Sequence, residues 1–241
     1  MKNLILTTAA LALTAGMSMA DTVRMGTEGA YPPYNFINDA GEIDGFEREL
    51  GDELCKRAEL ECEWVKNDWD SIIPNLVSGN YDTIIAGMSI TDERDEVIDF
   101  TQNYIPPAAS AYVAASDAAD LEGGVIAAQT ATIQAGHVAE GGATLVEFAT
   151  PEETIAAVRN GEADAVFADK DYLVPIVEES GGDLIFVGDD VPLGGGVGMG
   201  LRESDGELRG KFDTAIDSMK ADGTLNTMIK KWFGENAVVY D

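Results

Sequence analysis

The stretch GMSITDER at positions 87–94 decides how the rest of the chain is interpreted. It follows the apolar run TIIA at 83–86, which is typical of a buried strand, and Thr91 stands where a helix N-cap is expected. Backbone N–H groups at such a turn bind anions, and the planar guanidinium of Arg94 can hold two carboxylate oxygens at once. These features predict a site that binds a carboxylate group. The alternative is that Arg94 pairs only with neighbouring acidic side chains on a solvated helix face.

The first 20 residues are typical of a secretory signal peptide. Lys2 provides a basic head, an apolar stretch runs from Leu4 to Ala15, and the small residues at 18–20 form a cleavage site. The apolar stretch is too short to span a bilayer, and no cysteine follows the cleavage site to carry a lipid anchor. We therefore expect residues 1–20 to be removed and the mature protein to be exported and soluble.

The 241-residue chain is strongly acidic. It holds 44 Asp and Glu against 15 Lys and Arg, a formal net charge of −29 at pH 7. Nucleic acid and anionic membranes are poor partners for such a field, whereas a small cation is attracted to it. Solvation in a salty exterior explains the acidity equally well. Because 45% of the residues are hydrophobic and lie among the acidic ones, the chain is not of the disordered acidic class.

Cys55 and Cys62 are the two cysteines of the chain. An even number of cysteines in an exported chain favours a disulfide, which would close a short loop and contribute roughly 2 to 3 kcal/mol. A zinc site is the weaker interpretation, because the one histidine, His137, is far away in the sequence. We expect no metal and no cofactor.

Strands and helices alternate along the first part of the chain. Apolar positions recur every four residues from Phe46 to Ala58, which predicts a helix with Glu47 and Glu49 outside its buried face. The alternation predicts a mostly parallel sheet with helices on its faces. A further helix is expected at 72–77, and strands are expected at 23–27, 61–65 and 83–86.

A second α/β unit is expected beyond the prolines at 106–107, and it echoes the first. The segment GNYDTIIA at 79–86 matches GEADAVFA at 161–168 at the glycine, the aspartate, an apolar pair and the last alanine. Ligands of open α/β sheets bind beyond the carboxyl ends of the strands. The echo, if it is not chance, therefore predicts two similar lobes that deliver Gly87 and Asp169 to one cleft.

Several motifs, taken in order, resemble the periplasmic polar amino-acid-binding proteins of ABC importers, which form bacterial solute-binding protein family 3. The resemblance runs from about Val23 to Phe233 and is closest to binders of lysine, arginine and ornithine, of histidine and of opines. The motifs that carry it are GTEGAYPPYNF (26–36), GF (45–46) through LCKR (54–57), WDSIIP (69–74), MSITDER (88–94), ADGT (221–224) and WF (232–233).

The resemblance implies the type II periplasmic binding protein fold, with a ligand cleft between two α/β lobes joined by two hinge strands. Lobe 1 would comprise residues 21–107 and 193–241, and lobe 2 residues 108–192, with hinges near Pro107 and near the glycine run at 194–200. It also implies the Cys55–Cys62 disulfide. Such a protein is a periplasmic monomer that captures a free L-amino acid by lobe closure and delivers it to an inner-membrane ABC permease.

The resemblance further implies contacts to the amino-acid head group. Arg94 and the backbone N–H of Ser89 would bind the α-carboxylate, with Thr132 of the second lobe as a further contact. The Ser89 hydroxyl, the Gly87 carbonyl and Asp169 would bind the α-ammonium. The run QTAT at 129–132 departs from the Gln/Ala-Gly-Thr pattern that is usual in the family.

The side chain of the ligand would lie between the rings of Tyr31 and Trp69, an arrangement that suits a cation. Glu28 stands where binders of basic amino acids keep a carboxylate for the distal charge. The resemblance therefore implies a basic ligand: arginine, lysine, ornithine, histidine or a related opine.

The alternative function is a periplasmic dehydratase of the cyclohexadienyl type on the same scaffold. Glu28 would then be a general acid at the leaving group. Arg94 and Asp169 together form a complete site for an amino-acid zwitterion, which favours a binding protein over an enzyme. A sensor domain is a third possibility. It is less favoured, because we see no transmembrane segment attached to it in the sequence.

Overall fold

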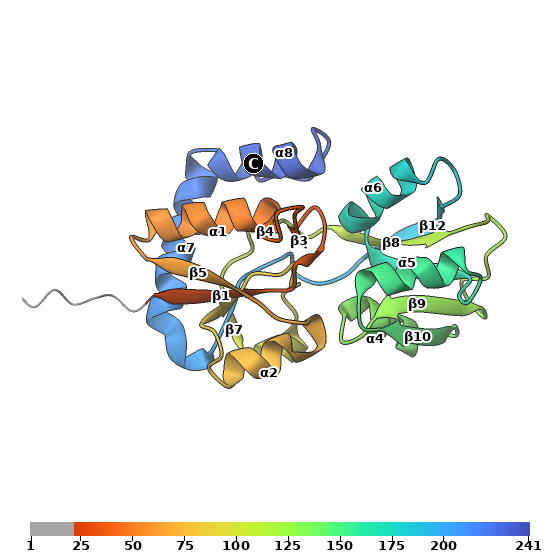
Figure 1. Cartoon of the computed structure of the whole chain (residues 1–241), viewed down its shortest axis with the longest axis horizontal. Helices are drawn as coiled ribbons and strands as arrows, with labels where there is room; N and C mark the ends of the chain where they lie inside the picture. Colours follow the sequence, from red (N-terminus) through yellow and green to blue (C-terminus); the bar gives the residue numbers. More distant parts are fainter. Residues whose placement is uncertain (1–21) are drawn as a thin grey trace, which may run out of the picture.

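The computed structural model describes residues 22–241, so the expected signal peptide at 1–20 lies outside the described residues. Figure 1 shows two bodies side by side, each built on a five-stranded sheet. The first sheet takes strands from both ends of the chain. Its order is β5 (Cys62–Lys66), β1 (Val23–Thr27), β6 (Thr83–Ile84), β13 (Gly200–Leu201) and β7 (Asp99–Phe100).

The second sheet is formed by the middle of the chain alone. Its order is β10 (Thr144–Phe148), β9 (Val125–Gln129), β11 (Ala165–Asp169), β8 (Ala109–Ala114) and β12 (Ile185–Pro192). This is the two-lobe α/β architecture that the resemblance implies. The Pro-rich loop after β1 adds a small sheet of three short strands, β2 (Ala30–Tyr31), β3 (Asn35–Ile37) and β4 (Ile43–Asp44).

Both sheets are mixed, whereas the alternation of elements predicts mostly parallel sheets. β1 pairs in parallel with β5 and β6, and β9 with β10 and β11. β13 is antiparallel to β6 and β7, and β8 is antiparallel to β11 and β12. The chain reaches β8 and β13 from the other lobe, not through a helix packed on the same sheet, so the βαβ rule does not apply to them.

Helices cover the first sheet on both sides (Figure 1). α1 and α8 lie on one side, α2 lies on the other, and α1 also contacts α7. The predicted apolar face of α1 is confirmed, since Leu50 and Leu54 are fully buried, but Glu47 is fully buried as well. The helices of this lobe are α1 (Phe46–Arg57), α2 (Ile72–Val77), the short α3 (Asp92–Asp95), α7 (Gly206–Ala221) and α8 (Thr224–Phe233).

The helices of the second lobe pack around β8 to β11. Thr150 begins one of them with a complete capping box, in which the sequence TPEE at 150–153 supplies both the Thr and the Glu that the motif requires. The three helices are α4 (Ile133–Glu140), α5 (Pro151–Arg159) and α6 (Lys170–Glu179). No helix within residues 22–241 is long and apolar enough to cross a bilayer.

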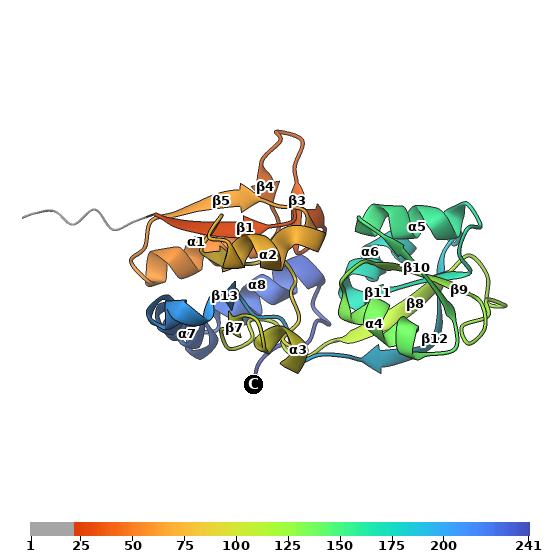
Figure 2. The same ribbon diagram turned by 90° about the horizontal axis from the view of Figure 1, so that it is seen from below.

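Two chain segments cross between the lobes, as Figure 2 shows. They are tied together where the N–H of Val197 donates to the carbonyl of Ile105 at 3.0 Å. The second segment is also held by the first lobe, since the N–H of Ile90 donates to the carbonyl of Gly196 at 2.9 Å. Gly196 has a φ of 90°, and a Cβ at this position would lie 2.5 Å from the Ile105 oxygen. Only glycine fits this close approach, which explains part of the glycine run.

The expected disulfide is present. Cys55 and Cys62 join the end of α1 to the start of β5. Within residues 22–241 no cluster of three or more His, Cys, Asp and Glu side chains is arranged to hold a metal ion. The ring of His137 packs against Phe167, with 5.3 Å between the ring centroids.

Candidate functional site

The two echoing segments occupy equivalent places in the two sheets. β6 is the central strand of the first sheet and β11 is the central strand of the second. Each is preceded by a helix that ends near a glycine of positive φ, 81° at Gly79 and 72° at Gly161. Gly87 follows β6 and Asp169 ends β11, and both line the same cavity. The echo in the sequence therefore reflects a repeated structural unit.

The cavity lies between the lobes. Its wall comes from both lobes, since Gln129, Gln134 and Tyr172 of the second lobe join residues of the first. All eight residues that the sequence predicts for the site line this one cavity: Glu28, Tyr31, Trp69, Gly87, Ser89, Arg94, Thr132 and Asp169.

Arg94 points into the site. Thr91 caps α3 as predicted, and its hydroxyl accepts a hydrogen bond from the Arg94 backbone N–H at 3.2 Å. The guanidinium donates to the carbonyl of Ser89 at 2.9 Å and, across the cleft, to the carbonyl of Ala131 at 3.2 Å. Its Cζ lies 5.4 Å from the centroid of the Trp69 ring.

The charge of Arg94 is not neutralised by its neighbours on α3. Among residues 22–241 no ion pair joins Arg94 to an acidic side chain, so the structure does not support the solvated-face alternative. Burial lowers the pKa of Arg94 to about 10. A half-buried cation with no acidic partner among the described residues is well suited to bind an anionic group of a ligand.

Asp169 is held on the opposite wall by neutral donors. The hydroxyl of Tyr31 donates to its Oδ2 at 2.8 Å, and Nε2 of Gln134 donates to its Oδ1 at 2.9 Å. Asp169 stands at the N-cap position of α6 but makes no capping hydrogen bond with its side chain. Burial raises its pKa to about 6. The carboxylate is therefore directed at the cavity and the other lobe.

Glu28 is a second carboxylate in the wall, and its side chain is almost fully enclosed at 4% exposure. Its one hydrogen-bond donor within residues 22–241 is Nε2 of Gln129, 2.7 Å from Oε1. Burial raises the pKa of Glu28 to about 7. The hydrogen bond from Gln129 and the charge of Lys66 lower this pKa less than burial raises it, and the Lys66 ammonium pairs with Asp68 at 3.3 Å. Glu28 is thus a buried acid that lacks a cationic partner in the described chain.

The aromatic part of the wall contains a residue that the sequence did not reveal. Tyr31 stacks on Tyr172 of the other lobe, with 4.2 Å between the centroids and 11° between the planes. Tyr172 is 3% exposed and lines the cavity. One face of Tyr31 is therefore covered by Tyr172, while Trp69 lies against the guanidinium of Arg94.

The unusual run at 129–132 has a local explanation. Ala131 has a φ of 56°, in the left-handed region that favours glycine. The hydroxyl of Thr132 caps α4, where it accepts from the N–H of Ala135 at 3.1 Å and donates to the carbonyl of Gln129 at 2.7 Å. Thr132 lines the cavity, but its hydroxyl already serves the start of the helix.

Residues 23–235 match the family described as bacterial extracellular solute-binding proteins, family 3. The chain belongs to this family. The L-arginine-binding protein of Pseudomonas aeruginosa is 34% identical over 88% of this chain and 87% of its own length. The lysine/arginine/ornithine-binding periplasmic protein of Escherichia coli K12 is 33% identical over 94% of this chain and 96% of its own length.

A solved structure of a family member is much more similar. A periplasmic His/Glu/Gln/Arg/opine family-binding protein from Silicibacter pomeroyi, crystallised in complex with lysine, is 89% identical. The two structures agree with a TM-score of 0.90 over 91% of this chain and 100% of the other. Family membership confirms the type II fold and the periplasmic location, and it decides for a binding protein over a dehydratase.

Proposed function

We propose that this protein captures a basic L-amino acid, with lysine as the first candidate, and delivers it to an ABC permease in the inner membrane. The observation that carries the proposal is the enclosed carboxylate of Glu28, in a cavity that also holds Arg94 and Asp169. The relative that is 89% identical was crystallised with lysine, and other relatives carry the names of arginine and lysine binders.

The head group of an amino acid matches one end of the cavity. The guanidinium of Arg94 suits the α-carboxylate, and the carboxylate of Asp169 suits the α-ammonium. In this assignment the backbone N–H of Ser89 supports the carboxylate, and the Ser89 hydroxyl and the Gly87 carbonyl support the ammonium. Both residues line the cavity beside Arg94.

The charges of the wall favour a cationic side chain. Arg94 and Asp169 carry one charge each and balance the zwitterionic head group. A neutral ligand leaves Glu28 either ionised and unpaired, at a penalty of about 1 to 3 kcal/mol, or protonated, since its pKa is about 7. An ammonium or guanidinium group placed beside Glu28 removes this penalty, and the faces of Tyr31 and Trp69 accommodate its aliphatic stem.

Capture is proposed to couple to closure of the two lobes. We infer that residues 21–107 with 193–241 move as one body and residues 108–192 as the other, with bending confined to the crossing segments. The ligand contacts are divided between these bodies, so a bound ligand favours the closed arrangement. A monomer in this arrangement would present both lobes to the permease.

Calorimetric titration with single amino acids tests the proposal. Lysine, arginine, ornithine, histidine and an opine are compared with glutamine and glutamate, and lysine is expected among the tightest. A ligand at 100 times its Kd should raise the free energy of unfolding by about 2.7 kcal/mol, measurable as a rise in Tm. Tightest binding of glutamine or glutamate would overturn the basic ligand. Unchanged uptake of labelled lysine by cells that lack the protein would count against delivery to a permease.

A further inference from the structure

Glu47 is a charged residue in the interior of the first lobe that the proposed ligand contacts do not use. It lies in the first turn of α1, and its side chain is 0% exposed. We propose that Glu47 is a positioning residue, whose carboxylate holds Gly87 directly and Gly29 through Asn35, and so fixes the two segments that carry the ligand contacts of this lobe. The inference rests on the proposed function and deepens it.

The first segment is held at Gly87, which lines the cavity. The backbone N–H of Gly87 donates to Oε1 of Glu47 at 2.6 Å, and the hydroxyl of Tyr104 donates to the same oxygen. Gly87 has a φ of 61°, a backbone conformation that other residues rarely adopt. A hydrogen bond to a carboxylate is about twice as strong as a bond between neutral groups, so Glu47 is well suited to hold this turn in place.

The second segment is the loop that carries Glu28 and Tyr31. Nδ2 of Asn35 donates to Oε2 of Glu47 at 2.7 Å, and Oδ1 of Asn35 accepts from the backbone N–H of Gly29 at 2.6 Å. Asn35 is itself fully buried. The Asn35 amide therefore links the Glu47 carboxylate by two hydrogen bonds to the backbone of Gly29, which follows Glu28 and lies two residues before Tyr31.

The donor pattern defines the state of the carboxyl group. Three neutral donors, from Gly87, Tyr104 and Asn35, point at its two oxygens. A protonated Oε2 would face the NH₂ of Asn35 and find no acceptor, and a protonated Oε1 would reverse the bond to the Tyr104 hydroxyl, so the pattern favours the ionised form. Burial raises the pKa of Glu47, and the hydrogen bonds from Tyr104, Gly87 and Asn35 lower it. The relay therefore has a fixed direction, with every donor pointing toward Glu47.

This direction makes the role testable by exchange. Glu47→Gln places an NH₂ group against either Asn35 Nδ2 or the Gly87 N–H, which are both donors. Combining it with Asn35→Asp restores the match: the glutamine oxygen can accept from Gly87 and Tyr104, its NH₂ can donate to the new carboxylate, and that carboxylate can still accept from Gly29. The pair of substitutions also keeps one negative charge in the relay.

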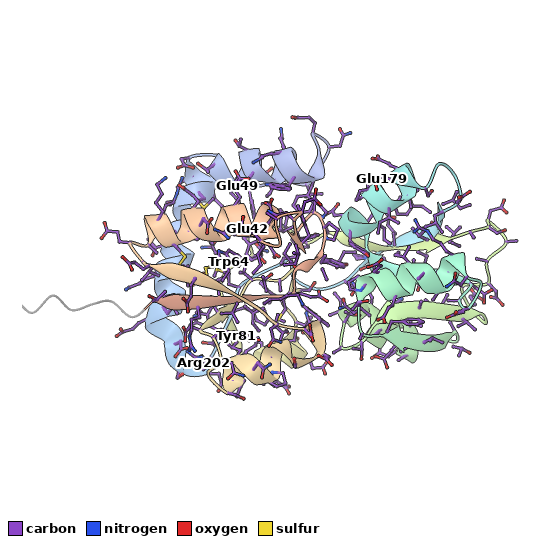
Figure 3. All side chains as sticks on the ribbon, in the orientation of Figure 1. Glu42, Glu49, Trp64, Tyr81, Glu179 and Arg202 are labelled. Carbon is purple, nitrogen blue, oxygen red and sulfur yellow. A yellow bond between two sulfur atoms is a disulfide. The ribbon has the colours of Figure 1, made fainter. Side chains whose placement is uncertain are left out.

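The experiment measures the lysine Kd by calorimetry and the unliganded Tm for each variant. Glu47→Gln is expected to raise the lysine Kd at least tenfold, and the double variant is expected to return to within threefold of the unmodified protein. The matched control is Glu49→Gln, two residues along α1. Glu49 lies between α1 and α8 (Figure 3), where it accepts from Lys231 Nζ at 2.6 Å and Trp232 Nε1 at 2.7 Å. This control should lower the Tm and change the lysine Kd less than twofold.

A purely structural carboxylate gives a different result. In that case Glu47→Gln would lower the Tm and leave the lysine Kd of the folded protein unchanged, and this outcome overturns the inference. A double variant that binds lysine no tighter than Glu47→Gln also overturns it. If Glu47→Gln does not fold, Tyr104→Phe decides, because it keeps the ring and removes one donor. A lysine Kd raised threefold or more supports the relay, and an unchanged Kd overturns it. Failure of the proposed function is distinct, since the unmodified protein would then not bind lysine.

Discussion

Glu28 predicts a pH dependence of lysine binding. Its carboxyl group is enclosed, and burial raises its pKa to about 7, whereas a free glutamate has a pKa of about 4.3. If the cation of lysine binds only the ionised form, about nine-tenths of the sites are competent at pH 8 and about one-tenth at pH 6. Glu28 alone should therefore raise the lysine Kd about tenfold between pH 8 and pH 6.

The assay is calorimetry at several pH values in buffers of different ionisation enthalpy. At pH 7 lysine should release about half a proton per site, because binding ionises the fraction of Glu28 that is still protonated. Glu28→Gln should remove most of the pH dependence and leave about a twofold change from Asp169, whose pKa is raised to about 6. Glu63→Gln, on the exposed side of β5, serves as the control. A Kd that stays constant from pH 6 to 8, or a full tenfold change in Glu28→Gln, refutes the reasoning.

Ionisation of Glu28, which strengthens lysine binding as the pH rises, destabilises the unliganded protein. The pKa of Glu28 is higher in the folded state than in the unfolded state, so its contribution to the free energy of unfolding is fully present below about pH 4.3 and is lost as the pH rises through about 7. Unliganded Glu28→Gln should therefore gain Tm relative to the unmodified protein between pH 5 and pH 8. Scanning calorimetry without ligand measures this difference, and a gap that shrinks with pH contradicts the assignment.

Three further outcomes follow from the site and the fold. Arg94→Ala should weaken lysine binding by about 3 to 5 kcal/mol, or roughly two to four decades in Kd, because the ligand carboxylate loses its charged partner. If the variant has an unchanged circular dichroism spectrum and binds lysine within a few-fold of the unmodified protein, this role of Arg94 is wrong. Asp169→Asn should raise the lysine Kd about 100-fold, at a cost typical of a buried charge pair, and should reduce the ligand-induced fall in radius of gyration seen by small-angle scattering. No compaction of the unmodified protein with saturating lysine would contradict the two-lobe clamp. Replacing both Cys55 and Cys62 by serine should lower the free energy of unfolding, measured by urea titration, by roughly 2 kcal/mol. The lysine Kd should stay unchanged, since the disulfide closes a short loop away from the cavity. A changed Kd would show that the disulfide affects the site.

Much of the site could be predicted because its residues follow strands. The end of β6 and the end of β11 are recognisable from apolar runs, and the turns that follow them carry Arg94 and Asp169. Helix starts were equally predictable where a side chain forms the cap, as at Thr91 and Thr150. The resemblance to the family added Glu28, which composition alone does not distinguish among 44 acidic residues.

The remaining features depend on contacts between distant parts of the chain. Glu47 lies on a helix among other acidic residues, so helical periodicity predicts an exposed side chain, and only the donors of Asn35, Gly87 and Tyr104 explain its burial. Tyr172 acquires its role from Tyr31, 141 positions earlier in the sequence. The antiparallel strands β8 and β13 depend on how the chain crosses between the lobes, which local patterns do not encode.

The ties between the two crossing segments limit how the protein can move. Val197 bonds to Ile105, so the two crossings are paired at this point, and Gly196 bonds to Ile90 of the first lobe. A paired ribbon of this kind favours rotation about one axis and resists twist. If the lobes close as proposed, a single distance between them describes most of the motion, and one fluorescent dye on each lobe would report ligand binding.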